Sequence, residues 1–280
     1  QSGRDEQSGL TALLNNVSRP GIKDLPNEQT GILVVGGDCP TRGLRGMQQR
    51  MELYNLSTDE WHPTGSCDHR HGFGMCIVRG QLVIAGGRSS TTVHDGVEVY
   101  GEVDPAGAST WERVATLPVP VTGCTLETAD GQLFVIAGRD GNLRLTNSVQ
   151  ALDMQTGEWW SFPPLITPRA FSASCMLNGC MLVAGGFDAD KEPIATAEQY
   201  QMGKERWEPL PSMGTARAYA TAADWNGLMV VCGGEGEDRV ALRTVEAYDP
   251  LKRVWTPWPE MSMARSGCVV VVSDGDIVVM

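Results

Sequence analysis

The feature that most constrains this fold is a unit of about 48 residues that recurs along the whole chain. Its clearest copy runs from Arg217 to Trp255 and carries five landmarks. These are an Arg, a turn Gly ten residues later, a Gly-Gly pair six residues after that, and then a Tyr and a Trp seven residues apart. A unit of this size buries its apolar surface only against its neighbours, so the period indicates a repeat architecture.

Local chemistry inside this copy predicts four short strands. The Asn226-Gly227 dipeptide lies between two apolar runs and favours a two-residue hairpin turn. Gly233 and Gly234 end the second run, where the missing Cβ atoms allow a sharp bend and close approach of neighbouring backbone. A short alternating strand, a turn that begins with Asp-Pro and a final aromatic strand follow. The copy is therefore expected to be a four-stranded antiparallel meander.

The other copies keep the same offsets. The Trp recurs every 48 to 50 residues, at Trp61, Trp111, Trp159, Trp207 and Trp255. The first Gly of the pair, or its replacement, recurs at Gly36, Gly86, Ala137, Gly185 and Gly233. The third copy is degenerate, because Val121 replaces the Arg, Ala137 the first Gly and Leu152 the Tyr. Its strand pattern holds, so we expect the fold to tolerate these changes.

This combination of period and landmarks resembles the kelch repeat, from Gly31 to Met280. The resemblance implies an all-β kelch β-propeller of four-stranded antiparallel blades around a central channel. Arg265 and Gly275 begin a sixth copy, so we expect the six-bladed type truncated within the last blade, with five Gly-Gly/Trp repeats plus the start of a sixth. The first strand of blade one would then be absent. A five-bladed alternative pairs the apolar run from Cys268 directly with the run from Ile32.

The chain is predicted to divide into a tail and one domain. Residues 1–30 are polar apart from a short apolar patch at residues 11–14, so we expect a disordered linker or tail, with the propeller at residues 31–280. Apolar residues make up 41% of the sequence, which is enough for cores between blades. No run approaches the roughly 20 apolar residues of a membrane span.

The net charge and the positions of the cysteines limit the classes of partner and the cellular compartment that we expect. A net charge of −12 argues against nucleic acid as a partner, since phosphate binding needs a basic surface. Six of the eight cysteines fall in predicted strands as small hydrophobes, and no secretory segment opens the chain, which favours the cytoplasm. Cys67, His69 and His71 alternate on one strand, but no fourth ligand is indicated, so neither a metal site nor a cofactor is predicted.

Two interpretations of the repeated Arg remain open. Arg70, Arg169, Arg217 and Arg265 share one position of the repeat, so propeller symmetry would place them on a ring at one face. Guanidinium groups pair bidentately with carboxylates, so this ring is a candidate receptor for a partner. Alternatively, the Arg is a hydrogen-bonding residue between blades, and both roles can hold together. No catalytic motif is present, and we predict that the domain is not an enzyme, although oxidases and a sugar epimerase share the architecture.

The repeats most resemble the kelch domains of BTB-kelch proteins. That resemblance implies a protein-interaction domain, the substrate-recognition propeller of an adaptor for a cullin-type E3 ubiquitin ligase, with the ligase contacted through other domains. It also implies a peptide-binding face formed just after the repeated Arg and just after the Gly pair. The implied partner-binding residues are Arg70, His71, Arg88, Arg139, Arg169, Phe171, Phe187, Arg217, Tyr219, Arg265 and Ser266. The alternatives are an actin-associated kelch scaffold and a regulatory propeller fused to an enzyme module.

Overall fold

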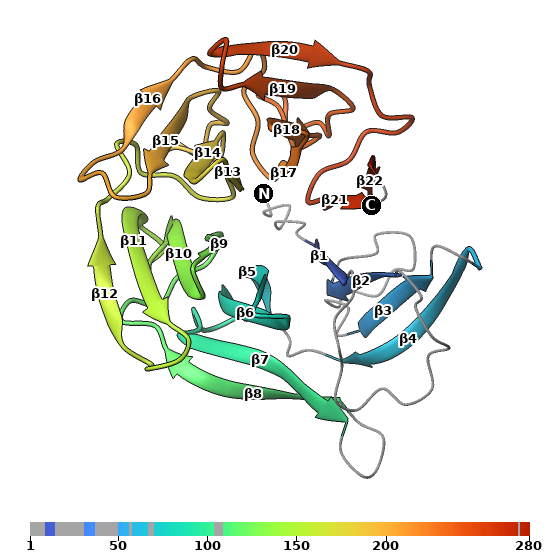
Figure 1. Ribbon diagram of the computed structural model, residues 1–280, viewed down its shortest axis with the longest axis vertical. Coiled ribbons are helices and arrows are strands. Elements are labelled where there is room, and N and C mark those ends of the chain that lie inside the picture. Colours follow the sequence, from blue (N-terminus) through green and yellow to red (C-terminus); the bar gives the residue numbers. More distant parts are fainter. Residues whose placement is uncertain are drawn as a thin grey trace.

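The computed structural model arranges short β-strands as a ring of sheets around a central axis (Figure 1). It describes residues 9–14, 31–36, 50–55, 58–66, 70–103, 109–273 and 275–280. These residues contain five four-stranded antiparallel sheets, each a blade, and one two-stranded sheet. The predicted all-β propeller with four-stranded blades is thus confirmed, and the described residues include no helix.

Each blade runs outward from the axis, and consecutive strands pair in antiparallel order. Blade 1 consists of β1 (Gly9–Leu14), β2 (Gly31–Gly36), β3 (Arg50–Asn55) and β4 (Glu60–Ser66). Blade 2 consists of β5 (His71–Val78), β6 (Gln81–Arg88), β7 (Gly96–Val103) and β8 (Ser109–Thr116). Blade 3 consists of β9 (Thr125–Ala129), β10 (Gln132–Arg139), β11 (Leu145–Asp153) and β12 (Trp159–Phe162).

The remaining sheets follow in chain order around the ring (Figure 1). Blade 4 consists of β13 (Ala173–Leu177), β14 (Cys180–Ala184), β15 (Ala197–Gln201) and β16 (Glu208–Leu210). Blade 5 consists of β17 (Thr221–Trp225), β18 (Leu228–Cys232), β19 (Val245–Asp249) and β20 (Val254–Trp258). The two-stranded sheet contains β21 (Val270–Ser273) and β22 (Asp276–Val279), and β21 contacts both β17 and β1.

The predicted two-residue turns join the first and second strands of four blades. Asn226 and Gly227 have φ angles of 51° and 82°, which is the left-handed pair of a type I′ turn. The same pair of positive φ angles recurs at Arg79-Gly80, Asp130-Gly131 and Asn178-Gly179. These turns fix the register of each inner hairpin, and so fix which side chains face the neighbouring blade.

The core lies between blades rather than inside one sheet. The second strand of a blade is buried on both faces, as in β6 and β10, where six consecutive residues are buried. The repeated Tyr and Trp pack against each other within a blade, with ring centroids 5.2 Å apart for Tyr248 and Trp255. The Trp255 indole N–H donates to the carbonyl of Pro211, at 2.8 Å, and so ties the fourth strand to the preceding connection. The aromatic landmarks are therefore packing residues of the blade.

The Gly-Gly pair is needed for contact between blades. The backbone N–H of Gly186 donates to the carbonyl of Arg217 on the next blade at 2.8 Å, and Gly234 makes the same bond to Arg265. A Cβ atom on Gly185 would lie 2.4 Å from that Arg217 oxygen, closer than real Cβ contacts allow. The predicted close approach of neighbouring backbone thus occurs, and the first Gly of the pair makes room for it.

The structure differs from the sequence analysis at the start of the propeller. Gly9–Leu14, expected to belong to the tail, forms β1 and pairs with Gly31–Gly36 as the first strand of blade 1. No hairpin signal identifies it, because a long polar connection separates the two strands. β2 pairs with β1 and β3 rather than with the run from Cys268, which pairs with β22 instead. The other predicted tail residues lie outside the described residues.

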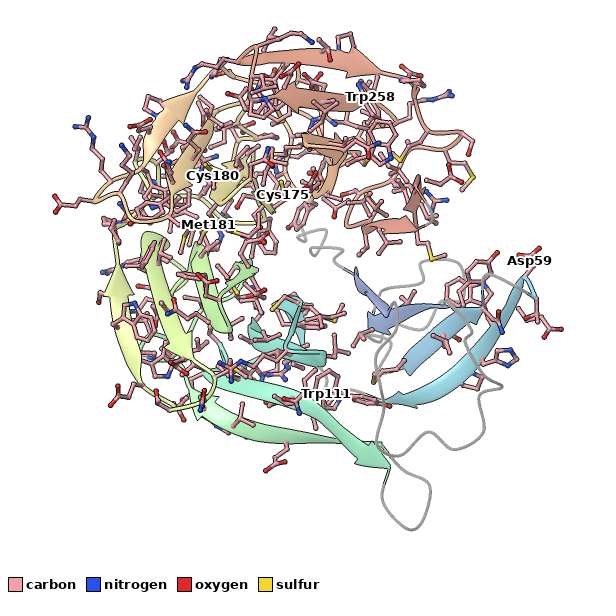
Figure 2. All side chains as sticks on the ribbon, viewed as in Figure 1. Asp59, Trp111, Cys175, Cys180, Met181 and Trp258 are labelled. Atoms are coloured by element: carbon pink, nitrogen blue, oxygen red, sulfur yellow. The ribbon has the colours of Figure 1, made fainter. Side chains whose placement is uncertain are left out.

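The described cysteines occupy strand and core positions, as expected. All six are free thiols, and Cys175 lies on the innermost strand of blade 4, while Cys180 lies on the next strand out (Figure 2). Burial raises the pKa of the Cys124 and Cys268 thiols to about 11, so both are unreactive at neutral pH. Within the described part of the chain, no helix has the length and apolar character to cross a membrane.

Candidate partner-binding face

Three of the four repeated arginines lie inside the blades. Arg169 and Arg217 have no exposed surface, and Arg70 is 3% exposed. Each guanidinium forms an ion pair with a Glu of the third strand of its own blade: Arg70 with Glu98, Arg169 with Glu198 at 2.7 Å and Arg217 with Glu246 at 2.7 Å. The arginines therefore share one position, as symmetry requires, but their charge is neutralised within the fold.

The guanidinium of Arg169 is saturated by its own blade. Its Nη1 donates to the carbonyl oxygens of Gly185 at 2.7 Å and Thr196 at 2.9 Å, and its Nη2 donates to Glu198. Arg217 makes the same three contacts, to Gly233, Thr244 and Glu246. Burial lowers the pKa of Arg169, while the charge of Glu198 opposes that shift. The repeated Arg is thus a hydrogen-bonding residue, but its side chain bonds within its own blade, whereas the alternative interpretation expected bonds between blades.

The acidic partners of Arg169 and Arg217 are also held by backbone N–H groups. Glu198 accepts the N–H groups of Ile166 at 2.6 Å and Thr167 at 3.3 Å. Those residues belong to the connection that leads from blade 3 into blade 4. The Arg169–Glu198 pair therefore joins three parts of one repeat, and a partner could reach this guanidinium only by displacing Glu198. Arg265, in contrast, is half-buried.

A ring of backbone hydrogen bonds surrounds the mouth of the central channel, two residues after the repeated Arg. Successive N–H to carbonyl bonds of 2.6 to 3.0 Å join adjacent blades, and they run through Gly72, Gly123, Phe171, Tyr219 and Gly267. All five residues have φ between 53° and 67°, which Gly adopts freely and aromatic residues rarely adopt. Phe171 and Tyr219 thus hold a strained backbone at a position where three other copies have Gly, and such strain is typical of functional sites.

The structure brings the three predicted aromatic residues together. The rings of Phe171 and Tyr219 are 4.5 Å apart, and Phe187 lies 5.2 Å from Tyr219. All three are at least nine-tenths buried, so they support the channel mouth more than they cover it. The guanidinium of Arg239 lies over the Phe187 ring, 5.0 Å from its centroid, on the outer side of this cluster.

The other predicted residues lie near the same end of the blades. His71 and Arg88 are paired across β5 and β6, and both are half-buried, as are Arg139 and Ser266. The Nη1 atom of Arg139 donates to the carbonyl of Leu143 at 3.4 Å, which links it to the adjoining loop. Cys67 and His69 lie outside the described residues, and no group of three metal-ligating side chains occurs among those described.

Three loops at this face share one hydrogen-bonded shape. They join the second and third strands of blades 3, 4 and 5, and each is closed by a backbone bond of 2.9 to 3.1 Å, from Asp140 to Arg144, from Asp188 to Glu192 and from Gly236 to Val240. The residue before the closing position has a φ of 60° to 64° in every loop: Leu143, Lys191 and Arg239. The backbone is repeated, but the side chains at the tips are different.

Sequence reasoning missed these tip residues. Leu143 is 42% exposed and Val240 56% exposed, although both are aliphatic, and Arg239 pairs only loosely with Glu235 and Glu192, at 3.5 and 3.6 Å. The loops that follow the Gly pair have equal length in blades 3, 4 and 5, and this sequence feature could have identified the tip residues. Residues immediately after the Gly pair are half-buried or buried. The exposed side chains of this face therefore lie three to five residues further along the chain.

A ring of such blades with variable loops at one face defines a class of protein, the kelch-type β-propellers, which serve as protein-interaction domains. The comparison with family models supports that class directly. The KLHDC2/KLHL20/DRC7 Kelch-repeats domain matches residues 72–280, and the chain belongs to this kelch-repeat family. The resemblance drawn from the Gly-Gly, Tyr and Trp landmarks is thereby confirmed.

Several curated proteins match part of the chain. Spermatocyte protein spe-26 of Caenorhabditis elegans is 31% identical over 49% of this chain and 23% of its own length. Alpha-scruin of Limulus polyphemus is 27% identical over 58% of this chain and 18% of its own length. Human Kelch-like protein 35 is 29% identical over 55% of this chain and 25% of its own length. The chain thus spans a quarter or less of each relative.

Proposed function

We propose that this propeller captures a segment of a partner protein on the face that carries the Leu143, Lys191 and Arg239 loops. The observation that carries the proposal is the common backbone of these three loops together with their different exposed tips. A rigid scaffold that presents variable loops is the usual arrangement of a binding surface. The Phe171, Phe187 and Tyr219 cluster supports the loops from beneath.

The chemistry of the tips suits a mixed apolar and charged segment. Leu143 and Val240 provide exposed aliphatic surface, and the Arg239 guanidinium over the Phe187 ring provides a positioned cation. Arginine and aromatic residues are enriched among interface residues that dominate binding energy. Glu192 and Glu235 beside Arg239 weaken the attraction for a purely acidic segment. We therefore expect the partner segment to contribute an apolar anchor.

The experiment that tests this face uses matched exposed residues. Leu143→Asp combined with Val240→Asp places charge on the two aliphatic tips, and Leu251→Asp is the control. Leu251 is 94% exposed in the turn between β19 and β20, at the opposite end of the blade from the Val240 loop. Affinity purification with quantitative mass spectrometry should lose its specific partners with the double variant and keep them with the control. Equal loss in both, or retention in both, would place the binding surface elsewhere.

We further propose that the partner is a ubiquitination substrate and that the propeller is the recognition part of a BTB-kelch adaptor for a cullin-type ligase. The match to human Kelch-like protein 35 supports this assignment. Depletion of the full-length protein should then lower the ubiquitination of those partners whose capture needs Leu143 and Val240. Unchanged ubiquitination of every such partner would contradict the ligase role.

The alternative function is a cytoskeletal kelch scaffold. Matches to alpha-scruin and beta-scruin cover as much of this chain as the match to Kelch-like protein 35 does, so similarity alone favours neither function. Co-sedimentation of the propeller with actin filaments, lost in the Leu143→Asp and Val240→Asp variant, would favour the scaffold. In either case we propose a binding role without catalysis, in the cytoplasm, where the six free thiols of the described residues stay reduced.

A further inference from the structure

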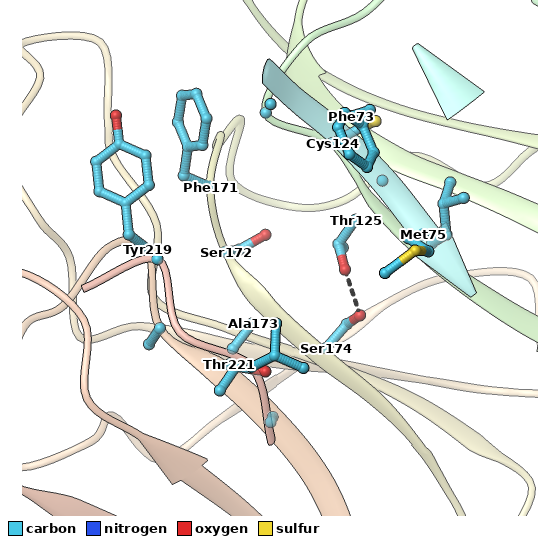
Figure 3. Close-up of a pocket in the computed structure, with 18 of the residues that line it drawn as sticks. Phe73, Met75, Cys124, Thr125, Phe171, Ser172, Ala173, Ser174, Tyr219 and Thr221 are labelled. Carbon is cyan, nitrogen blue, oxygen red and sulfur yellow. Dashed lines mark hydrogen bonds between the residues drawn. The ribbon is translucent and has the colours of Figure 1, made fainter. Parts of the chain in front are cut away.

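A cavity of about 220 Å³ lies along the axis of the propeller, bounded by the inner strands and the residues just before them. It begins at the mouth ring, where Gly72, Gly123 and Gly267 contribute no side chains, and it reaches Glu127 on β9. Figure 3 shows Phe171 and Tyr219 at one side of this space and the hydroxyls of Thr125 and Ser174 beside each other deeper in it. The cavity therefore leads from the proposed partner-binding face towards a polar group.

Glu127 breaks the pattern of the repeat. It lies four residues after the mouth-ring Gly, and the same position in the other copies holds Cys76, Cys175, Ala223 and Val271. All four of those residues are small or apolar. A carboxylate in this place is not required by the fold, since four other copies of the repeat do without it. A charge at an otherwise apolar position on a cavity wall indicates a ligand-binding role.

One hydroxyl group contacts the carboxylate, and a second contacts that hydroxyl. The Ser174 hydroxyl donates to Glu127 Oε1 at 2.5 Å, and Thr125 Oγ1 lies 2.7 Å from Ser174 Oγ, the contact drawn in Figure 3. The backbone of Met176 also hydrogen-bonds the carboxylate. A carboxylate has about four acceptor positions, so these two donors leave capacity for a ligand.

Among the described residues, no cation compensates this charge from within the cavity. Of the described residues that line the space, none is Lys, Arg or His. The described titratable groups that feel the charge of Glu127 from adjacent strands are the thiols of Cys76 on β5 and Cys175 on β13, and Asp224 on β17 also acts on Cys175. Burial raises the pKa of Glu127 to about 7, so half of the carboxylate is ionised at neutral pH.

We propose that this axial cavity binds a linear primary ammonium group, with the Glu127 carboxylate as its counter-ion and Thr125 and Ser174 as orienting hydroxyls. The ammonium has three N–H donors, and its alkyl chain lies against apolar lining residues such as Met75 and Val269. A metal ion fits poorly, because no three metal-ligating side chains gather among the described residues. The ligand is either the lysine side chain of a partner segment or a free aliphatic amine.

The test is an NMR titration of the whole chain with two probes, n-butylammonium and the peptide acetyl-Gly-Lys-Gly-amide. Saturable shifts of the Thr125 and Ser174 amides are expected in the wild type. Glu127→Gln should weaken binding at least tenfold, while the control Glu158→Gln, an exposed carboxyl in the turn between β11 and β12, should bind like the wild type. Wild-type affinity should be about tenfold lower at pH 6 than at pH 8, because the ionised fraction of Glu127 falls by that factor.

Each outcome decides the proposal. Binding of either probe that depends on Glu127 supports it, and the tighter probe identifies the source of the ammonium. Equal binding to the Glu127→Gln variant, absence of saturation, or equal affinity for tetramethylammonium, which has no N–H donors, overturns it. Should Glu127→Gln fail to fold, Ser174→Ala provides a second test, with an expected affinity loss of about threefold. The Leu143→Asp and Val240→Asp variant should still bind n-butylammonium, so this proposal fails or stands separately from the partner-binding face.

Discussion

Blade 3 and blade 4 have the same strand order but different polar centres. Blade 4 holds the buried pair of Arg169 and Glu198, with a distance of 2.7 Å between guanidinium nitrogen and carboxylate oxygen. At the equivalent positions blade 3 has Val121, which is fully buried, and Gln150, which is 6% exposed. Both charges have therefore been replaced together, and the blade keeps its four strands.

Gln150 shows which hydrogen bonds around the Arg169–Glu198 position are needed for the fold. Its side-chain oxygen accepts the N–H of Val119 at 3.1 Å, as Glu198 accepts the N–H of Thr167 at 3.3 Å. The contact to the incoming backbone is thus common to both blades, whereas the ion pair is not. A buried ion pair can often be exchanged for neutral residues at small cost, but removal of one partner leaves an uncompensated charge. The two blades illustrate the first half of that rule, and mutants of blade 4 test the second.

The largest effect is expected when blade 4 receives only half of the blade 3 sequence. Arg169→Val removes the cation and leaves Glu198 buried without its partner, which should lower the free energy of unfolding by about 3–5 kcal/mol. Urea denaturation followed by circular dichroism measures this loss. A decrease of less than about 1 kcal/mol would mean that the pair contributes nothing that Val cannot replace.

A second difference concerns the first residue of the Gly pair. Blade 4 has Gly185 with a φ of 68°, and blade 3 has Ala137 with a φ of 55°. A Cβ atom on Gly185 would lie 2.4 Å from the carbonyl oxygen of Arg217, so Gly185→Ala should cost about 2–4 kcal/mol from strain and overlap.

The reverse change serves as the control. Ala137→Gly relieves the left-handed strain but removes a buried methyl group, and these terms of about 1 kcal/mol each should nearly cancel. Thermal unfolding of both variants separates the two cases. If Gly185→Ala is as mild as Ala137→Gly, the blades do not differ in how closely the next blade approaches.

A further test places both residues of the blade 3 pair, Val and Gln, at the equivalent positions of blade 4. Arg169→Val together with Glu198→Gln should fall within about 1 kcal/mol of the wild type, because the amide oxygen still accepts the backbone N–H groups and no charge is left alone. Urea denaturation of the double variant beside both single variants gives the coupling energy. A double variant that loses the sum of the single losses would show that blade 3 is stabilised by other contacts.

The sequence predicted those features that repeat, since each has a steric cause. The turn at Asn226-Gly227 and the close contact at Gly185 follow from backbone geometry alone, so their spacing revealed the propeller. The burial of Arg169 could not be predicted, because its partner Glu198 lies on a strand whose register depends on the folded blade. Likewise, β1 showed only a short apolar patch with no hairpin turn beside it, and Glu127 became noticeable only when the structure placed it on a cavity wall.

The smallest expected effect on stability concerns Glu127, the carboxyl that only blade 3 carries at this position of the repeat. The folded pKa of Glu127 is about 7, above its ordinary value of 4.5, so the folded chain binds more protons than the unfolded chain between these values. Stability should therefore fall as the pH rises from 4.5 to 7.

Glu127→Gln removes this penalty, and at pH 8 we expect the variant to be more stable by about 1 kcal/mol, a modest value because the carboxyl is partly exposed. At pH 5 the two proteins should unfold at nearly the same urea concentration, since the folded carboxyl is then protonated and most of the penalty has gone. A difference that stays constant from pH 5 to pH 8, as expected for the exposed control Glu158→Gln, would mean that the axial carboxyl of blade 3 titrates like an ordinary surface group.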